Sequence, residues 1–301
     1  MEVIPRGREA RSTLLSDDGT EKHQPLPGDP LIVSLNFDDG SSDQYAVRSI
    51  LAERSMRATF YINSGAVGMP GYLNWRQLAE LAADGNEVGG HTVDHVRLTT
   101  LSASAARSQI ANDRQALMSH GFAVTSFAYP YGDFDTNVEA IVQSCGYSAA
   151  RRGWGLLPID RTGPNRHKWY GVVFDRFRTN INPDLAEELP PVNRYAIRTI
   201  GLGAGNTVAE LKNLVTRAER NGGGWVTLVF HHVGSSDAAA NGYFVSPVVL
   251  RAFLEWLELR AARGTYVLTV RDALAEVGGR PSAALLDEGP FPLRQERAVG
   301  S

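Results

Sequence analysis

The amino-acid sequence predicts an α/β fold, a distorted (β/α)7-type barrel in a single catalytic domain. Apolar runs of strand length alternate with helical patterns, which indicates parallel strands joined by crossover helices. The alternation gives about seven strand–helix units, a number more typical of a barrel than of an open sheet. A chain of 301 residues with 43% hydrophobic content can also bury the core of one large domain.

Each expected strand is a short run rich in branched aliphatic or aromatic residues. In chain order, these runs cover residues 31–37, 58–62, 86–91, 125–130, 147–151, 224–232 and 265–270. Several of the segments between them show the apolar spacing of helices that bury one face. These helical segments cover residues 43–54, 74–84, 102–120, 136–145, 208–220 and 247–263.

Three segments fall outside this alternation. Residues 1–30 and 278–301 contain Pro- and Gly-rich stretches, so we expect an N-terminal tail or arm and a C-terminal tail around a domain at 31–277. Residues 153–193 are rich in proline, arginine, asparagine and aromatic residues and show no periodicity. A loop of this length inside a barrel is expected to be functional or mobile.

Composition excludes several classes of function. The 30 basic and 33 acidic side chains nearly balance, which gives no reason to expect nucleic acid or acidic lipid as a partner. Cys145 is the only cysteine, so an intrachain disulfide and a cysteine-rich metal site are both excluded. No apolar run is long enough to span a bilayer. Residues 1–30 lack the apolar segment of a secretory signal, so either the protein stays inside the cell or the sequence begins after a removed leader.

Polar residues gather at the C-terminal ends of the expected strands, where the reactive groups of α/β barrels converge. The first strand ends in residues 36–40 (NFDDG), the third in 91–95 (HTVDH), the fourth in 129–132 (YPYG) and the sixth in 231–232 (HH). Four of the seven histidines fall in these segments. The sequence therefore predicts a reactive site at this end of the barrel.

The pattern of carboxylates and imidazoles favours a metal. Two adjacent buried carboxylates repel each other, so a site that keeps both generally contains a cation or a hydrogen-bonding partner. Alone, Asp38 and Asp39 would more often cap a helix or form a turn with Gly40. His91 and His95 are four residues apart and can bring two imidazoles to one point, as in zinc sites, although ordinary loop histidines are the alternative. One carboxylate with two imidazoles leaves coordination positions open for water and substrate.

These motifs resemble those of a known family, the NodB-homology polysaccharide deacetylases, or carbohydrate esterase family four. Residues 36–40 (NFDDG) are similar to the family's TFDDG, and 91–95 (HTVDH) match its His-Ser/Thr-x-x-His. Residues 127–132 (FAYPYG) are similar to its third motif, and 228–231 (LVFH) resemble its fifth, Leu-x-Leu-His. The resemblance covers roughly residues 31–277, and several motifs in the same order are more specific than any single one.

The resemblance implies a role for each matching residue. The expected metal ligands are Asp39, His91 and His95. Asp38 would be the general base for an attacking water, and His231 the general acid that protonates the departing amine. The backbone N–H of Tyr131 would help to hold the oxyanion. The residues expected around the substrate are Tyr131, Pro130, Trp154 and Leu228.

The chain departs from the family pattern in two places. Ala128 stands where the third motif usually has an arginine that pairs with the catalytic aspartate. Arg198 could supply the missing guanidinium to Asp38, which is a hypothesis based on its place in the sequence. The fourth motif is not clearly present, and Asp175 and Trp154 are the candidates for its aspartate and tryptophan.

His231 and His232 cannot both enter one site from a regular strand, because adjacent side chains point to opposite faces. The motif alignment favours His231, and His232 is expected to be structural. His231 is out of phase with Leu228 and Phe230, so the prediction requires the strand to end near Phe230.

The implied activity is metal-dependent removal of N-acetyl groups from a polysaccharide that contains N-acetylglucosamine, such as chitin, peptidoglycan or an exopolysaccharide. Two alternatives stay open: the same site acting on O-acetyl esters of xylan or on cyclic amides and imides, and a carbohydrate-binding protein with a weakened active site. Zinc suits the donor set, and cobalt, nickel or manganese could replace it. The family implies an extracellular or cell-envelope location, while a cytoplasmic location stays open.

Overall fold

The structure, a computed structural model, describes residues 30–156, 186–203, 205–234 and 243–276, together with the backbone of two short strands near the N-terminus. Those strands, β1 (Thr13–Leu15) and β2 (Glu21–His23), pair antiparallel within the expected N-terminal arm. The expected C-terminal tail and residues 157–185 of the long insertion lie outside the described residues. The proposed domain limits therefore stay a prediction.

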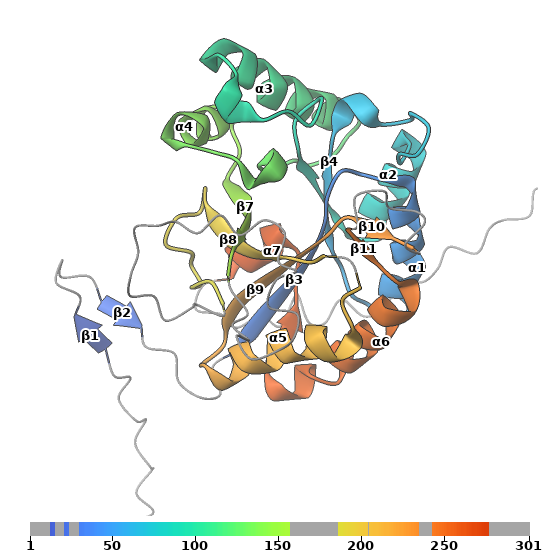
Figure 1. Ribbon diagram of the computed structural model, residues 1–301, viewed down its shortest axis with the longest axis vertical. Coiled ribbons are helices and arrows are strands. Elements are labelled where there is room, and N and C mark those ends of the chain that lie inside the picture. The colour runs from blue at the N-terminus through green and yellow to red at the C-terminus, as the bar shows by residue number, and fades with distance from the viewer. Residues whose placement is uncertain are drawn as a thin grey trace, which may run out of the picture.

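Seven parallel strands form a closed barrel with helices around it (Figure 1). The strands are β3 (Leu31–Phe37), β4 (Thr59–Ile62), β5 (Glu87–Gly90), β6 (Ser126–Ala128), β7 (Ala149–Gly155), β8 (Ile197–Gly201) and β9 (Gly224–Phe230). Each pairs with the next along the chain, and β9 pairs with the whole length of β3, which closes the ring. The predicted (β/α)7 barrel is confirmed.

One of the seven strands of the ring, β8, is not among those that the sequence pattern indicates. β8 is absent from the expected strands because Arg198 and Thr199 interrupt its apolar run. The expected last strand is shorter, β12 (Thr265–Val267), and lies outside the ring beside the first half of β3. β4 pairs only with Asn36 and Phe37, which leaves the first half of β3 without a partner on that edge. β12 pairs with β3 in this half.

The helices lie close to the expected positions. They are α1 (Val47–Ala52), α2 (Trp75–Ala83), α3 (Ala103–Ser119), α4 (Thr136–Ser144), α5 (Val208–Arg220), α6 (Pro247–Glu258) and α7 (Val270–Ala275). Capping boxes start α2 at Asn74 and α5 at Thr207: the side-chain oxygen of each cap accepts from the backbone N–H of the third helical residue, whose own side chain accepts from the backbone N–H of the cap. The expected helix at 247–263 ends at Glu258 and continues only as a 3₁₀ turn (Ala261–Arg263). A small parallel pair, β10 (His232–Val233) and β11 (Phe244–Val245), lies next to the end of β9.

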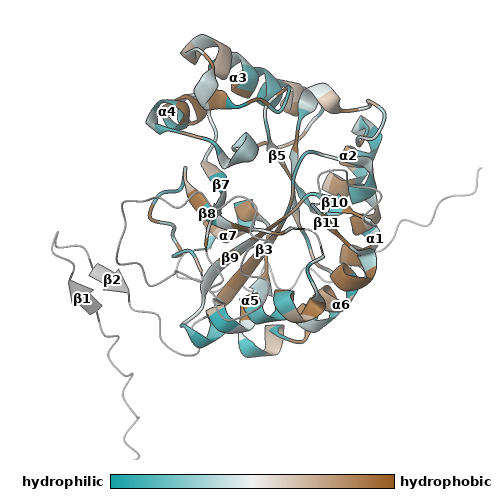
Figure 2. Ribbon diagram, viewed as in Figure 1, coloured by the Kyte–Doolittle hydropathy of each residue, from teal (hydrophilic) through white to brown (hydrophobic). Residues whose placement is uncertain are grey.

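Side chains of the barrel strands alternate between two hydrophobic cores. In β3, Leu31, Val33, Leu35 and Phe37 pack with the helices, whereas Ile32 belongs to a smaller core inside the barrel. Figure 2 shows β3 largely in the hydrophobic colour and the surrounding helices in mixed colours. We call the phase of Ile32 barrel-facing and that of Leu31 helix-facing. Only a barrel-facing side chain can take part in chemistry at the barrel opening.

The N-terminal end of the barrel is closed by α7, whose Val270 and Ala273 pack against Ile32 and Trp225. Glu87, fully buried on β5, accepts hydrogen bonds from the backbone N–H of Arg271 and from two side-chain hydroxyl groups of neighbouring strands. The N-terminal end of the barrel is therefore closed by apolar packing and by hydrogen bonds to Glu87.

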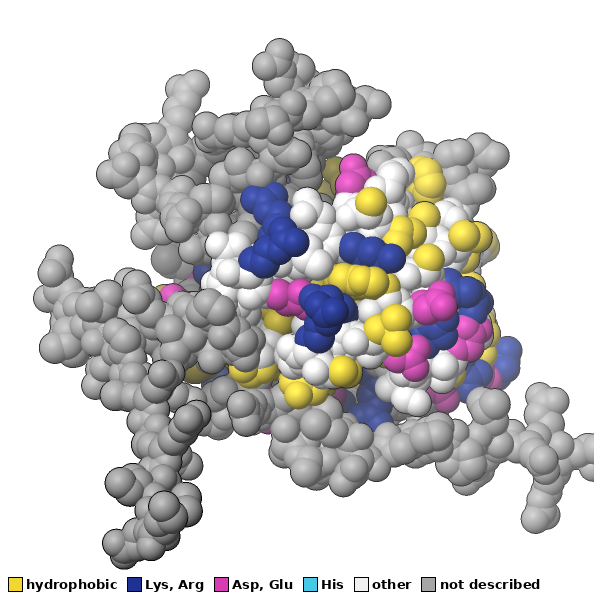
Figure 3. Space-filling model, turned by 90° about the horizontal axis from the view of Figure 1, so that it is seen from below, with side chains coloured by type: hydrophobic (Ala, Val, Ile, Leu, Met, Phe, Trp, Pro, Cys, Tyr) yellow, Lys and Arg dark blue, Asp and Glu magenta, His cyan; other side chains and the backbone are white. Residues whose placement is uncertain are grey.

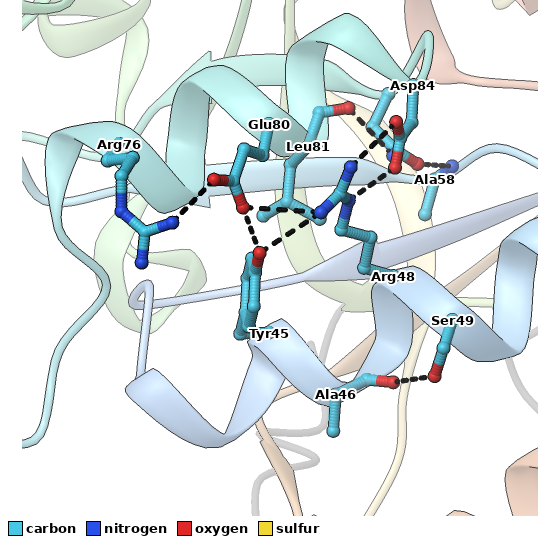
Figure 4. A network of polar contacts seen from close by, with 10 residues as sticks. Tyr45, Ala46, Arg48, Ser49, Ala58, Arg76, Glu80, Leu81 and Asp84 are labelled. Atoms are coloured by element: carbon cyan, nitrogen blue, oxygen red, sulfur yellow. Dashed lines mark hydrogen bonds and ion pairs between the residues drawn. The ribbon is translucent and has the colours of Figure 1, made fainter. Parts of the chain in front are cut away.

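On the outside of the barrel, α1 and α2 are joined by polar contacts (Figure 4). The Arg48 guanidinium donates to both carboxylate oxygens of Asp84 and also reaches Glu80, which accepts a hydrogen bond from Tyr45. These side chains are about one-third exposed, so the network positions two helices more than it stabilises the fold.

The side of the molecule near α5 and α6 carries basic, acidic and hydrophobic side chains intermixed, without a large patch of one charge (Figure 3). The described helices include none with the length and apolarity of a membrane span.

Candidate metal centre and active site

Three side chains from two strand ends meet at the C-terminal opening of the barrel. Asp39 follows β3, and His91 and His95 follow β5. The Nε2 atoms of His91 and His95 lie 3.4 Å and 3.2 Å from the same oxygen, Asp39 Oδ1. One ligand atom from each residue lies within 4.8 Å of the others. The structure therefore brings together the predicted Asp–His–His group.

The spacing of these atoms fits a shared metal ion. Donors at about 2.1 Å from a tetrahedral zinc lie roughly 3.4 Å from one another, which is longer than a strong hydrogen bond. His91 Nδ1 lies 2.7 Å from the backbone oxygen of Ala128, an arrangement that leaves Nε2 free for a metal. Metal-binding histidines usually hold their second ring nitrogen in this way.

The charges at the group also suit a cation. Burial would raise the pKa of the Asp39 carboxyl, but His91, followed by His231 and His95, holds it well below the ordinary value. Burial and the neighbouring charge of His91 lower the pKa of His95 to about 4. Burial lowers the pKa of His91, but the interaction with Asp39 outweighs it and raises the pKa. At neutral pH the site therefore offers an ionised carboxylate and a neutral His95 imidazole, the forms that bind a metal.

Asp38 points into the barrel and forms a buried ion pair with Arg151. It continues the barrel-facing phase of β3, and its carboxylate is almost fully buried. Arg151 is 1% exposed and stacks its guanidinium over the Tyr61 ring, 4.3 Å from the ring centroid. In the sheet, Arg151 on β7 lies directly opposite Ala128 on β6. Arg151, at the position paired with Ala128 on the next strand, therefore supplies the guanidinium that the resemblance leads one to expect at position 128.

This pairing corrects the expectation for Arg198. On β8, Arg198 has the helix-facing phase, because its neighbour Ile197 belongs to the core inside the barrel. Its guanidinium forms an ion pair with Glu187 at 2.6 Å. Burial would raise the pKa of Glu187, but its bonds to Arg198 lower it. Arg198 therefore does not pair with Asp38.

His231 lies at the opening, and His232 is occupied elsewhere. β9 ends at Phe230, as the prediction required, and His231 follows the barrel-facing phase of Trp225. The electrostatic interaction of His231 lowers the pKa of both Asp39 and His95, in agreement with a side chain that points toward the same opening. His232 Nδ1 lies 2.9 Å from Asp43 Oδ2, in agreement with the structural position expected for it.

The Gln44 side chain joins the strand ends that carry Asp38 and His231. Its amide donates hydrogen bonds to the backbone oxygens of Asp38 and His231, the latter at 2.6 Å. Neither Asp38 nor Asp39 caps the next helix, because Ser41 occupies the N-cap position, while Asp39 and Gly40 do form a turn, as in the other expected alternative.

The residues expected around the substrate separate into two groups. Tyr131 is 45% exposed and its ring contacts His95, with 4.5 Å between centroids. Trp154 is partly exposed and lies next to Gly132, so it is also near this opening. Pro130 is buried, and Leu228 is fully buried in the helix-facing core. Leu228 was wrongly expected at the substrate, because it has the opposite phase to His231; Asp175 lies outside the described residues.

Backbone strain is concentrated at the same opening. Five residues other than glycine have a positive φ in the described part of the chain, and four of them belong to the site loops. They are Asp39 (73°), Thr92 (69°), His95 (52°) and Tyr131 (59°). Such conformations cost about 1–3 kcal/mol each and are typical of functional sites.

Sequence reasoning missed Arg151 and Gln44. Arg151 could have been found, since it ends an expected strand in the same phase as the buried Ala149. Gln44 offers no comparable signal, because its role depends on how two distant strand ends lie next to each other.

Comparison with known proteins gives a match to a family model and partial matches to curated relatives. Residues 27–150 match the family model described as "Polysaccharide deacetylase". A peptidoglycan-N-acetylglucosamine deacetylase of Listeria monocytogenes is 32% identical over 110 residues, 35% of this chain and 22% of the relative. A chitin deacetylase of Colletotrichum lindemuthianum is 31% identical over 121 residues, 39% of this chain and 49% of the relative. The matches span half or less of the curated relatives' own length.

Among solved structures, the fold is similar to the Xyl-CE4 domain of a multidomain xylanase from the hindgut metagenome of Trinervitermes trinervoides. The TM-score is 0.51 and the identity 16%, over 82% of this chain and 90% of that domain. At this identity the likeness shows the barrel fold alone.

Proposed function

We propose that the chain, whose residues 27–150 match the polysaccharide deacetylase family model, hydrolyses N-acetyl groups on a polysaccharide containing N-acetylglucosamine. The observation that carries the proposal is the meeting of Asp39, His91 and His95 beside an Asp38 that is paired with a buried arginine. This combination supplies a metal site and a positioned carboxylate at one opening.

We assign the metal to Asp39, His91 and His95 and propose zinc, with cobalt, nickel or manganese as alternatives. A divalent ion in this set supplies Lewis acidity, which lowers the pKa of water and polarises a carbonyl.

Asp38 is proposed as the general base, which takes a proton from the attacking water. Arg151 holds the Asp38 carboxylate from inside the barrel, so the base keeps one orientation. The backbone N–H of Tyr131 is proposed to stabilise the oxyanion, and the Tyr131 ring and Trp154 to contact the substrate. His231 is proposed to protonate the nitrogen that leaves, because an unprotonated amine is a poor leaving group.

An N-acetylated polymer is the proposed substrate, since both relatives above carry names that refer to such polymers. A weakened, binding-only protein was considered because position 128 lacks the family's arginine. Arg151 supplies a guanidinium to Asp38 instead, so this reason no longer holds. Hydrolysis of O-acetyl esters or cyclic amides and imides would use the same metal group and is an outcome of the test below. We propose an extracellular or cell-envelope location, where such polymers occur.

The test is release of acetate from three substrates: N-acetylchitooligosaccharides, peptidoglycan and acetylated xylan. We expect release from at least one of the first two, loss of it with a chelator, and recovery on adding zinc. An Asp38→Asn variant should lose about 10²–10⁴-fold in turnover while it keeps its metal. Release from xylan alone would replace the N-acetyl substrate by an ester, and no release from any substrate would contradict the proposal.

A further inference from the structure

One face of α3 is hydrogen-bonded to the loop that carries both histidines. The backbone N–H of His91 donates to Asp113 Oδ2 at 3.0 Å. The N–H of Val93 donates to the backbone oxygen of Gln109 at 3.2 Å, and the N–H of Asp94 to Gln109 Oε1 at 3.0 Å. Gln109 and Asp113 are one helical turn apart, so α3 presents a row of acceptors along the loop.

The opposite side of the loop is held by donors. The Asn63 side-chain amide donates to the backbone oxygens of His91 and Thr92. The carboxylate of Asp113 also accepts from the backbone N–H of Ser64, at 2.9 Å through Oδ1. Asp113, which is fully buried, therefore joins the loop after β4 to the loop after β5.

These contacts address a specific difficulty. Thr92 and His95 both have a positive φ, so the loop between the histidines would relax to another shape if it were free. Without this shape the two imidazoles would not both face Asp39. Hydrogen bonds to N–H and C=O groups on both sides of the loop make the required shape the stable one.

We propose that Asp113 and Gln109 are positioning residues that pre-form the His91–His95 loop, so that metal affinity depends on α3. The inference rests on the metal site of the proposed function. It assigns a role in metal binding to α3, a helix that contacts neither the metal nor the substrate. Residues that orient metal ligands in this way typically change affinity by about 10–100-fold when they are replaced.

Asp113 needs a carboxylate because both of its partners are N–H donors. An asparagine would turn an NH₂ group toward one of these donors, so Asp113→Asn keeps the size and breaks one bond. Gln109→Ala removes the contacts of its side chain with Asp94 but keeps its backbone oxygen. We expect the asparagine variant to bind zinc 10–100-fold more weakly and the alanine variant to show a smaller loss in the same direction.

Two variants serve as matched controls. Gln115→Ala makes the same change on an exposed position of the same helix. Glu87→Gln changes a buried, hydrogen-bonded carboxylate at the other end of the barrel. Both should bind zinc within about twofold of the unchanged protein, since neither contacts the loop.

The experiment measures the zinc dissociation constant of the full chain by competition with a chelating indicator, and urea unfolding of the metal-free protein in parallel. Weaker binding in the loop variants, beyond any loss of stability shared with Glu87→Gln, supports the inference. Unchanged zinc affinity in both loop variants overturns it, even if they unfold more easily. If Asp113→Asn does not fold, Gln109→Ala decides alone, and failure of the unchanged protein to bind zinc would refute the proposed metal site instead.

Discussion

Both ends of the barrel bury carboxylates, but the groups that donate hydrogen bonds to these carboxylates differ between the two ends. At the N-terminal end, Glu87 receives hydrogen bonds from Thr59, Ser126 and the backbone of Arg271. At the C-terminal end, Asp38 depends on one guanidinium, that of Arg151. Among the described residues, Arg151 Nη1 and His231 Nδ1 are buried there without a hydrogen-bond partner.

The difference indicates how the fold divides its tasks. Buried polar groups are normally satisfied, so unsatisfied ones need a reason. The strained φ angles lie at the C-terminal end too, and in α/β barrels that end carries the chemistry while the other supports stability. We therefore expect substitutions at the C-terminal end to change activity, and substitutions at the N-terminal end to change stability.

Replacing His91 by alanine should have the greatest effect, because it removes one of the three proposed metal ligands. Turnover should fall on the order of 10³-fold or more, together with the bound metal, because the remaining donors hold the ion weakly. Metal content by atomic emission and acetate release would be measured on the same samples. His120→Ala, at an exposed histidine stacked on Trp75, is the control. Full activity in the His91 variant would contradict the assignment.

Arg151→Met should separate orientation of the base from metal binding. Turnover should fall by about 10²-fold with zinc retained, and unfolding should become easier by about 3–5 kcal/mol because Asp38 is left buried and unpaired. Adding Asp38→Asn should recover part of the stability but none of the turnover. Kinetics and urea unfolding of the two variants test this, and turnover equal to that of the unchanged protein would show that the pair is not catalytic.

At the other end, Glu87→Gln should lower the free energy of unfolding by about 1 kcal/mol through weaker hydrogen bonding. Turnover should stay the same, since Glu87 faces α7 rather than the metal. Urea unfolding and steady-state kinetics at one pH are sufficient. A loss of turnover without a loss of stability would break the division between the two ends.

The smallest effect is expected for Arg198→Ala, on the outside of the ring. Because the pKa of Glu187 is lowered in the folded protein, its pairing contributes stability above the unfolded pKa of 4.5, and this contribution is lost as pH falls below it. The variant should therefore be about 1–2 kcal/mol less stable at pH 7, and the difference should shrink toward pH 3. Turnover should not change. A pH series of urea unfolding curves tests the sign, and a difference that grows on acidification would refute the pairing.

Sequence could predict the metal group because its members lie in short segments that follow strong strands. His91 and His95 share one loop, and Asp39 directly follows a long apolar strand. The positions of the three side chains relative to the barrel opening are therefore limited to a few possibilities. The number of strands could be predicted from the alternation, whereas β8 was missed because Arg198 and Thr199 hide its apolar phase.

The partner of Asp38 depends on the register between two strands, which the sequence does not contain. Ala128 and Arg151 lie opposite each other only because β6 and β7 pair as they do, whereas the inward phase of Arg151 follows from its spacing to Ala149. The contacts of Asp113 depend in the same way on how α3 packs against the loop after β5. Tertiary packing decides both contacts, and Arg198 cannot take the place of Arg151 because its side chain faces the helices.

A zinc titration of the metal-free protein, followed by acetate release from N-acetylchitooligosaccharides and peptidoglycan, tests whether Asp39, His91 and His95 hold a metal that activity requires. We expect activity to rise linearly and to stop rising at one zinc per chain, and an Asp39→Asn variant to show no such rise. Full acetate release before any metal is added, or equal activation of the Asp39→Asn variant, would contradict this assignment.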